Sequence, residues 1–469
     1  MRLPKDKSEK VAADGTVAMK ADLAELSKLL QPFGLLPPQA ALAGAASVDG
    51  KVASSAAGIR GAGTLAVTGL DVSLPDAGIA LKEPQVSVPL TVEYATRERR
   101  WTAALTGISS ALVKGNASGS WTEPASPATV QGECNLAFDG ERLSAALGKN
   151  LPQGLHLAGA WGASGRVSGP LPSGETWNKV LAGLAGEGAI EVATFQYNKL
   201  TGGKGTLRWR LAGGELLIAD PAQPSKLALA GGTLNLAARV DLRGAVPHVV
   251  IPRPLRLVEG VPLSDPAVHD YLKFSIPLLL EGAVGAEGHV SVVIDSLDLP
   301  LADAELGKAV GAGSFTIDRF HTKLGGAMAA FLSSGGMSTE TKAPAQTLGP
   351  VAVRLQNSVL YMQQHDLLMN DGSVLKFQGR AGFNRSLEAS VEVPMSVTML
   401  RRVGMPDRDA QLIQNQRLLL GVTGTIDKPH LDEQAFWKRM GEIVIEYAKR
   451  RAIEEIGNRL KDSLMPRKK

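Results

Sequence analysis

The chain has 469 residues, of which 52 are glycine and 27 proline, with 4% aromatic residues and a net charge of +4. This length is too great for one ordinary domain, so we expect two or more units or a repeat array. The small net charge gives no support for a nucleic-acid partner, and the single cysteine, Cys134, excludes an internal disulfide and a cysteine-rich zinc site.

The amino terminus resembles neither a signal peptide nor a membrane anchor. Residues 1–15 are partly basic but lack the apolar segment of a secretory signal, and no window reaches about 18 consecutive apolar residues. Residues 17–20 already alternate as a strand does. We therefore expect the chain to start inside a β-sheet and to be the C-terminal part of a longer protein or the product of a split gene.

A strand, helix and strand unit occurs twice in the first part of the chain. Residues 22–30 (DLAELSKLL) place leucines on one helical face before Pro32, and residues 141–148 repeat this pattern. The following strands also match, LPPQAALAGAASVDGKVAS (36–54) against LPQGLHLAGAWGASGRVSG (151–169). The match predicts an internal repeat of roughly 115 residues, which is too long for a standard solenoid.

More helices and strands are expected in the middle of the chain. Residues 177–184 and the segment after Asp265-Pro266 have the helical spacing of apolar residues, and Pro277 ends the second run. The glycine-rich residues 202–206 (GGKGT) lack the spacing of a phosphate-binding loop, so we expect a hairpin turn there.

The clearest strand pattern is that of residues 373–393, SVLKFQGRAGFNRSLEASVEV. Apolar side chains occupy one parity and polar side chains the other, on both sides of a turn at Asn384-Arg385. Alternation with a period of two across a short turn predicts a β-hairpin with one apolar and one solvated face. Much of the chain resembles looser copies of this hairpin, so we expect about 20 or more strands and few helices.

The chain closes with a strand and a long helix. Residues 418–426 alternate as a strand, and residues 434–464 carry an apolar stripe opposite a heavily charged face. The simplest interpretation is a helix that packs on the last strands with a solvated outer face. Contact with anionic lipid or a partner helix is the alternative, and its candidate residues are Arg450, Arg451, Arg467, Lys468 and Lys469.

The sequence contains no motif for catalysis, a cofactor or a metal ion. The seven histidines lie far apart without HExxH spacing, and the chain has neither a GxSxG elbow nor a GxxxxGK[ST] loop. Acidic neighbours such as Glu454 and Glu455 belong to a charged helix face and not to a predicted cleft. We therefore predict a protein that is not an enzyme and uses no cofactor.

A sheet of this many strands must have its apolar face covered. Helices are few and short, so part of that face is left for a mate sheet, a partner or a ligand. An apolar groove suits an acyl chain, because each CH₂ that it buries contributes about 0.8 kcal/mol. The predicted lining residues are Leu234, Leu236, Val240, Leu375, Phe377, Phe383, Leu387, Val391, Val393, Leu418, Leu420 and Val422.

Two stretches resemble the closing module of AsmA-like proteins. One runs from NDGSVLKFQGRAGFNRSLEASVEVP through a short helical interlude to LLLGVTGTIDKPHLD, and the other joins GEGAIEVATFQY to GGELLIADPAQPSKLALAGGTLNLAARVDLRG. The resemblance to this AsmA/TamB-type family implies a repeating β-groove protein in the envelope of diderm bacteria. It also implies an inner-membrane anchor in the full-length protein, transport of phospholipids towards the outer membrane, and no catalytic residues.

We therefore predict a mainly β protein, a long curled antiparallel sheet with a few short helices and a long amphipathic C-terminal helix. Its expected segments are three β-groove modules at 1–170, 171–300 and 301–432, followed by the basic helix and tail at 433–469. The predicted function is transfer of phospholipid or another acyl-chain lipid through the periplasm, with a membrane surface or envelope protein as a further partner. The alternative is a structural or protein-binding β-sandwich or solenoid array without lipid.

Overall fold

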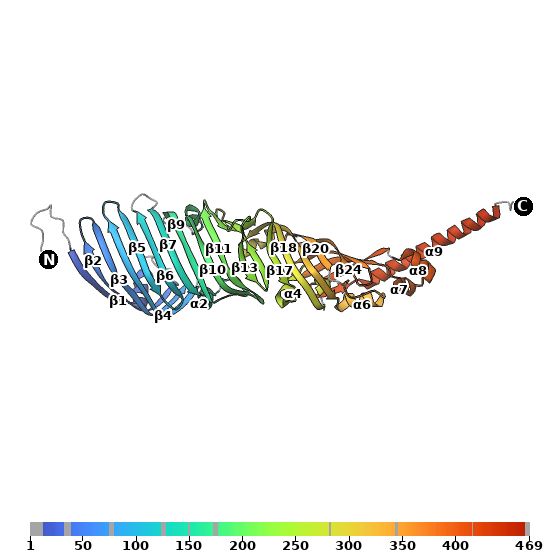
Figure 1. Cartoon of the computed structure of the whole chain (residues 1–469), viewed down its shortest axis with the longest axis horizontal. Helices are drawn as coiled ribbons and strands as arrows, with labels where there is room; N and C mark the ends of the chain where they lie inside the picture. The colour runs from blue at the N-terminus through green and yellow to red at the C-terminus, as the bar shows by residue number, and fades with distance from the viewer. Residues whose placement is uncertain are drawn as a thin grey trace, which may run out of the picture. The chain divides into compact units, whose positions relative to one another are not determined.

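The computed structural model describes residues 13–31, 39–74, 79–122, 128–148, 151–171, 177–280, 283–342, 346–414 and 416–464 (Figure 1). Strands hold 61% of the residues, which confirms the prediction of a mainly β chain. In the part of the chain that the structure describes, they form one antiparallel sheet of 25 strands. The predicted fold class is therefore confirmed.

The chain divides into two compact units. Unit 1 consists of Met1–Ile251 and Leu299–Asp303, and unit 2 consists of Pro252–Asp298 and Ala304–Lys469. The finer segment boundaries expected at residues 170, 300 and 432 stay predictions.

Unit 1 is built from antiparallel strands in which chain neighbours mostly pair with each other. Its strands are β1 (Ala13–Asp22), β2 (Ala41–Ser54), β3 (Gly58–Leu74), β4 (Ile79–Ala95), β5 (Arg100–Ser109), β6 (Val113–Thr122), β7 (Ala128–Asp139), β8 (Leu155–Ala158), β9 (Ala160–Leu171), β10 (Ala185–Tyr197), β11 (Leu200–Ala212), β12 (Glu215–Ile218), β13 (Ser225–Leu229), β14 (Gly232–Leu236), β15 (Ala238–Asp241) and β16 (His248–Ile251). Some long strands pair with two shorter strands placed end to end. Both β8 and β9 pair with β10, and both β12 and β13 pair with β11.

Three helices interrupt this succession of strands, α1 (Leu23–Leu30), α2 (Gly140–Leu147) and α3 (Trp177–Gly183). Asp22 caps α1 by accepting hydrogen bonds from the backbone N–H groups of residues 24 and 25, and Asp139 caps α2 in the same way. In both places the flanking strands pair with each other, β1 with β2 and β7 with β9. The predicted strand, helix and strand repeat therefore has the same local structure in both copies.

The glycine-rich segment at 202–206 is not the hairpin turn that its composition predicts. It lies inside β11, and the turn comes earlier, between β10 and β11. Lys204 has a φ of 46°, and the pairing of β11 with β13 shifts register between Gly203 and Gly205. The glycines therefore accommodate a β-bulge within a strand and not the hairpin turn that was expected.

Unit 2 combines long antiparallel strands with most of the helices. Its strands are β17 (Leu255–Pro262), most of β18 (Val284–Pro300), β19 (Val310–Lys323), β20 (Gln346–Gln356), β21 (Val359–Leu368), β22 (Val374–Gly382), β23 (Ser386–Pro394), β24 (Arg417–Thr425) and β25 (Lys428–Leu431). The predicted hairpin is present, since β22 pairs with β23 in the register that joins Phe377 to Val391.

Unit 2 contains the two helices that the apolar pattern predicted, after Asp265-Pro266 and at 434–464, together with further helices that it did not predict. The helices are α4 (Pro266–Leu272), α5 (Pro277–Leu280), α6 (Gly326–Ser334), α7 (Val397–Arg402), α8 (Asp407–Ile413) and α9 (Glu433–Leu464), with a 3₁₀ helix at Asp303–Lys308 before β19. Phe331 of α6 and Phe436 of α9 are both 1% exposed and meet edge to face, with ring centroids 5.0 Å apart. Unit 2 therefore has a closed core of helices packed on strands.

Candidate functional site: the inner face of unit 1

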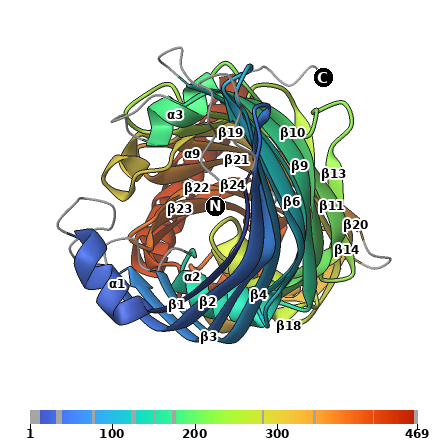
Figure 2. The ribbon, with the colours of Figure 1, turned by 90° about the vertical axis from the view of Figure 1, so that its left-hand side faces the viewer.

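The sheet of unit 1 is curved, and α1 and α2 lie on its concave side (Figure 2). We call this side the inner face. Helix α2 packs against β4 and β8, and its Arg142 lies 3.9 Å from the carboxylate of Glu83, a side chain with 2% exposure on β4. The backbone N–H of Ala111 donates a hydrogen bond of 2.8 Å to the same carboxylate. Glu83 therefore fixes α2 at one edge of the inner face.

Two rows of directly paired residues cross the sheet without a charged side chain. We assign them to the inner face because they are less exposed than most residues of the alternate parity. The first runs from β1 to β15 through Val17, Gly50, Gly63, Leu90, Leu105, Ala117, Cys134, Gly165, Gly188, Trp209, Ile218 and Ala238. The second runs beside it through Gly15, Val52, Gly61, Val92, Ala103, Gly119, Gly132, Val167, Gly186, Leu211, Leu216 and Val240. Strands are spaced about 4.8 Å apart, so each row extends about 50 Å.

The inner face is only partly covered. Every residue of the first row is half-buried, which is the exposure of side chains that touch neighbours on their own face but carry no second layer. In the second row only Leu211 and Val240 are buried. An apolar surface of this length, with no second layer formed by the residues that the structure describes, is unusual in a folded protein. It is the strongest candidate for a binding surface in unit 1.

Glycines shape the floor of the inner face. The ring of Trp209 lies across two neighbouring strands, because a Cβ atom built on Gly165 or Gly188 would stand 2.8 or 2.7 Å from its Cζ2 atom. At Gly132 the nearest atom to such a Cβ is 3.6 Å away, so this position is open. The backbone of the inner face is therefore covered by a side chain at some positions, such as Gly165 and Gly188, and open at others, such as Gly132.

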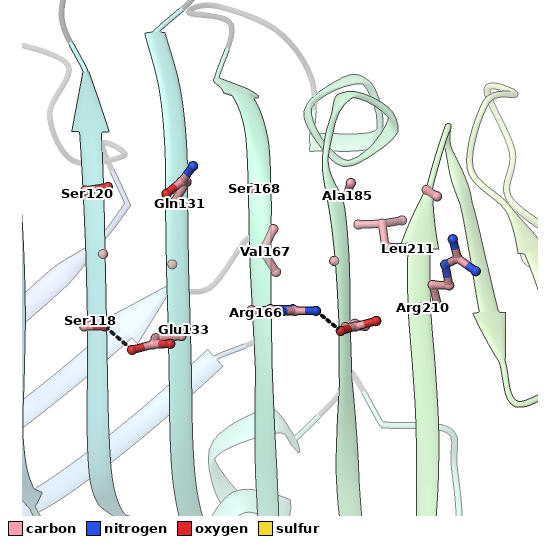
Figure 3. A pocket seen from close by; sticks show the side chains of 15 residues that line it. Ser118, Ser120, Gln131, Glu133, Arg166, Val167, Ser168, Ala185, Arg210 and Leu211 are labelled. Atoms are coloured by element: carbon pink, nitrogen blue, oxygen red, sulfur yellow. Dashed lines mark hydrogen bonds and ion pairs between the residues drawn. The ribbon is translucent and has the colours of Figure 1, made fainter.

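The opposite, outer face is polar. Between the two inner rows lies an outer row whose later members are Ser118, Glu133, Arg166, Glu187 and Arg210, side by side on five strands (Figure 3). Ser118 donates a hydrogen bond of 2.9 Å to Glu133, and Arg166 pairs with Glu187. These side chains border a shallow depression of about 590 Å³. Alternating charges that neutralise each other across strands are typical of a solvated sheet surface.

Three predicted lining residues belong to unit 1. Leu234 continues an inner row, since it pairs with Leu227, which pairs with Gly205. Leu234 and Leu236 are half-buried, whereas Val240 at the end of the second row is 8% exposed. Leu234 and Leu236 therefore lie on accessible parts of the inner face. The longer rows through β1 to β11 were not among the predicted lining residues, although their alternation could have indicated them.

The predicted lining residues of unit 2 are in a different situation. The hairpin at 373–393 was expected to keep its apolar face open, but in the structure this face is part of a closed core. Leu375, Val391, Val393 and Leu420 have no exposed surface, and Phe377, Leu387, Leu418 and Val422 are at most 7% exposed. Phe383 lies beyond the end of β22 and is 54% exposed.

Helices provide the cover. The sequence predicted that the C-terminal helix packs on the last strands, but it did not predict that helices also cover the hairpin. Residues before and within α5, including Ile276 and Leu279, lie against Phe377 and Ala389 around a residual cavity of about 20 Å³. Helix α9 packs on β24, and Met399 and Leu400 of α7 have no exposed surface. Since this parity is sealed, the open apolar surface is that of unit 1 and not that of the hairpin.

The candidate membrane contacts on α9 also have defined positions. Arg450 is exposed and pairs with Glu446 one helical turn away. Arg451 pairs with Asp409 of α8, so it joins two helices within unit 2. Residues Arg467, Lys468 and Lys469 lie outside the described residues. Of these five candidates, Arg450 alone is shown on an exposed helix surface.

Comparison with protein-family models, with curated proteins and with solved structures found no match to this chain. Among the described residues, no helix combines the length and the apolar character needed to cross a membrane. The same residues contain no group of three or more His, Cys, Asp or Glu side chains placed to hold a metal ion. The inner face of unit 1 is therefore the strongest candidate for a functional surface among the described residues.

Proposed function

We propose that unit 1 binds the acyl chains of phospholipids along its inner face and that the protein transfers lipid between membranes without catalysing a reaction. The observation that carries this proposal is the pair of uncharged, incompletely covered rows from β1 to β15. An acyl chain occupies one leaflet, about half of a hydrocarbon core of about 30 Å. A row of about 50 Å is long enough for such a chain to lie anywhere along it.

The energetics of burial favour an acyl ligand. Each CH₂ group that leaves water for an apolar surface contributes about 0.8 kcal/mol, so a chain of 16 carbons gains on the order of 10 kcal/mol. This gain needs no specific polar contact, which agrees with rows built only from apolar residues and glycine. Glycine positions such as Gly132 leave room above the backbone.

The resemblance to AsmA-like proteins supports the same proposal. With it we propose the periplasm of a diderm bacterium as the location and a membrane surface or an envelope protein as a further partner. A protein-binding array without lipid is the rival function. That rival was expected to have paired sheets, each covering the apolar face of the other, and the single antiparallel sheet favours lipid over it.

The test is to place a charge on the inner face and measure the bound lipid. Leu90 is half-buried in the first inner row, and its neighbour Thr91 is exposed on the outer face of the same strand. Lipid extracted from the purified protein and quantified by mass spectrometry should fall at least about fivefold in Leu90→Glu, because a carboxylate makes the surface unfavourable for CH₂ groups.

Thr91→Glu is the matched control, since it adds the same charge one residue away on the solvated face. It should retain the wild-type amount of lipid. Far-UV circular dichroism of both variants checks that the strands remain folded. Purified wild-type protein without lipid, or equal losses in both variants, would contradict the proposal.

A further inference from the structure

An aromatic ladder lies on the inner face of unit 1 where the strands reach their hairpin turns. Tyr94, Trp101 and Trp121 pair directly across β4, β5 and β6. The rings of Tyr94 and Trp101 have centroids 4.7 Å apart, and those of Trp101 and Trp121 are stacked with centroids 5.6 Å apart. Ile59 pairs with Tyr94 and extends the ladder onto β3.

Large apolar side chains of this ladder reach solvent. Trp121 is 40% exposed and Ile59 is 42% exposed, although both belong to the apolar parity of their strands. Tyrosine and tryptophan have an apolar body and a polar tip, and they are enriched at the interface between lipid and water. The ladder thus places interfacial residues at one edge of the inner face.

The turn next to this ladder is basic. Residues 97–100 read Arg-Glu-Arg-Arg and are all exposed at the tip of the β4–β5 hairpin. Glu98 pairs with Arg100 at 3.1 Å, which leaves Arg97 and Arg99 without an ion-pair partner among the described residues. A depression of about 710 Å³ lies between this turn and the β2–β3 turn, and Ile59, Tyr94 and Arg97 are among its lining residues.

We infer that these hairpin tips contact the surface of a bilayer that contains anionic phospholipid. The basic aromatic rim is defined as Ile59, Tyr94, Arg97, Arg99, Trp101 and Trp121. It places at lipid phosphates the guanidinium groups of Arg97 and Arg99, which form no ion pair with any described residue, and the rings below them. Arginine is complementary to phosphate in charge and in hydrogen-bonding geometry. The inference rests on the proposed function, because the rim then marks the edge at which lipid enters the inner face.

The experiment measures flotation of the full chain with vesicles of phosphatidylcholine, with and without an equal amount of phosphatidylglycerol. Wild-type protein should bind the anionic vesicles. Arg97→Glu/Arg99→Glu should bind them at least about tenfold more weakly, because each basic residue near an anionic surface contributes about a fivefold factor. Lys20→Glu/Lys51→Glu is the control, with the same change in net charge at exposed outer positions of β1 and β2.

The control should bind within about twofold of the wild type, since Lys20 and Lys51 lie within β1 and β2 on the outer face and not in the β2–β3 or β4–β5 turn. Equal losses in the two double variants, or wild-type binding by Arg97→Glu/Arg99→Glu, would overturn the inference. A second variant, Trp121→Ser, tests the apolar part and should also weaken binding. Wild-type flotation of Trp121→Ser would overturn the role of the ladder.

The two proposals fail separately. Leu90→Glu changes the inner face but no residue of the rim, so the Leu90→Glu protein should float with anionic vesicles as the wild type does. If the rim variants keep vesicle binding while lipid still co-purifies in a Leu90-dependent way, the rim inference fails and the proposed function stands. If no lipid co-purifies but the rim variants lose vesicle binding, the proposed function fails instead.

Discussion

At the scale of single residues, His365 on β21 shows how burial in unit 2 changes the chemistry of a side chain. It is 8% exposed and stacks on Phe377 with ring centroids 5.6 Å apart. Its Nδ1 atom lies 3.3 Å from the carbonyl oxygen of Gln363. Burial lowers the pKa of His365 below its usual value, because the imidazolium form loses hydration that apolar neighbours do not replace.

Mild acid should therefore destabilise unit 2. As the pH falls below about 6.5, the unfolded chain binds a proton at His365 before the folded protein does, so the free energy of unfolding decreases. Burial lowers the pKa of His269 as well and adds a slope of the same sign. In urea unfolding between about pH 7 and pH 5, His365→Leu should show a smaller loss of stability than the wild type.

An exposed histidine provides the control for this measurement. His430 lies at the surface of β25, so His430→Leu should keep the acid dependence of the wild type. If His365→Leu and the wild type lose the same free energy over this pH range, the buried imidazole does not contribute to the acid sensitivity.

The sequence predicted local structure best, namely where helices begin and which side chains of a strand share a face. The helices predicted at 22–30, at 141–148 and after Asp265-Pro266 are all present, and an aspartate caps each of them. The parity of residues 373–393 is also that of the observed hairpin. These features depend on neighbours within a few positions, which is why one sequence was enough.

At the scale of elements, glycines in unit 1 differ in what a side chain would meet. A Cβ atom at Gly188 would stand 2.2 Å from the backbone oxygen of Ser164, whereas one at Gly132 has open space beyond 3.6 Å. Both glycines lie in the middle of the inner face. The close approach of β9 and β10 therefore requires glycine at 188 but not at 132.

Gly188→Ala should lower the free energy of unfolding by about 1 to 3 kcal/mol, because backbone atoms cannot move aside as a flexible side chain can. Gly132→Ala should be neutral or stabilise the protein by up to about 1 kcal/mol, since alanine restricts the unfolded chain. Urea unfolding followed by tryptophan fluorescence compares them. Equal midpoints for the two variants would contradict this account of the floor.

The sequence did not predict that helices would cover the apolar face of the hairpin in unit 2. Helix α6 consists of GAMAAFLSS, which is apolar on all sides and lacks the stripe that identifies a surface helix. Its partner Phe436 lies about 100 residues further along the chain. Whether a strand face is open depends on such distant contacts, so the alternation alone could not distinguish a channel wall from a core.

At the scale of the whole molecule, the alternation of apolar and polar residues produces a buried apolar face in unit 2 and a half-buried one in unit 1. In unit 2 the apolar parity of β22 to β24 is sealed by helices, with no exposed surface at Val391 or Leu420. In unit 1 the corresponding parity is half-buried from Val17 to Ala238. We therefore assign structural stability to the apolar face of unit 2 and ligand binding to that of unit 1.

The only cysteine of the chain offers the most direct test of this assignment. Cys134 lies in the first inner row of unit 1, half-buried, and its neighbour Asn135 is exposed on the outer face. A fluorophore on Cys134 would thus report on the inner face, and one on Cys134→Ala/Asn135→Cys on the outer face of the same strand.

The measurement is quenching of each fluorophore by phospholipid that carries a spin label on its acyl chain. The account predicts saturable quenching of the fluorophore at position 134 and little quenching at position 135, because the acyl chain lies only on the inner face. Equal quenching at the two positions, or none at position 134, would contradict the claim that unit 1 binds lipid along its inner face.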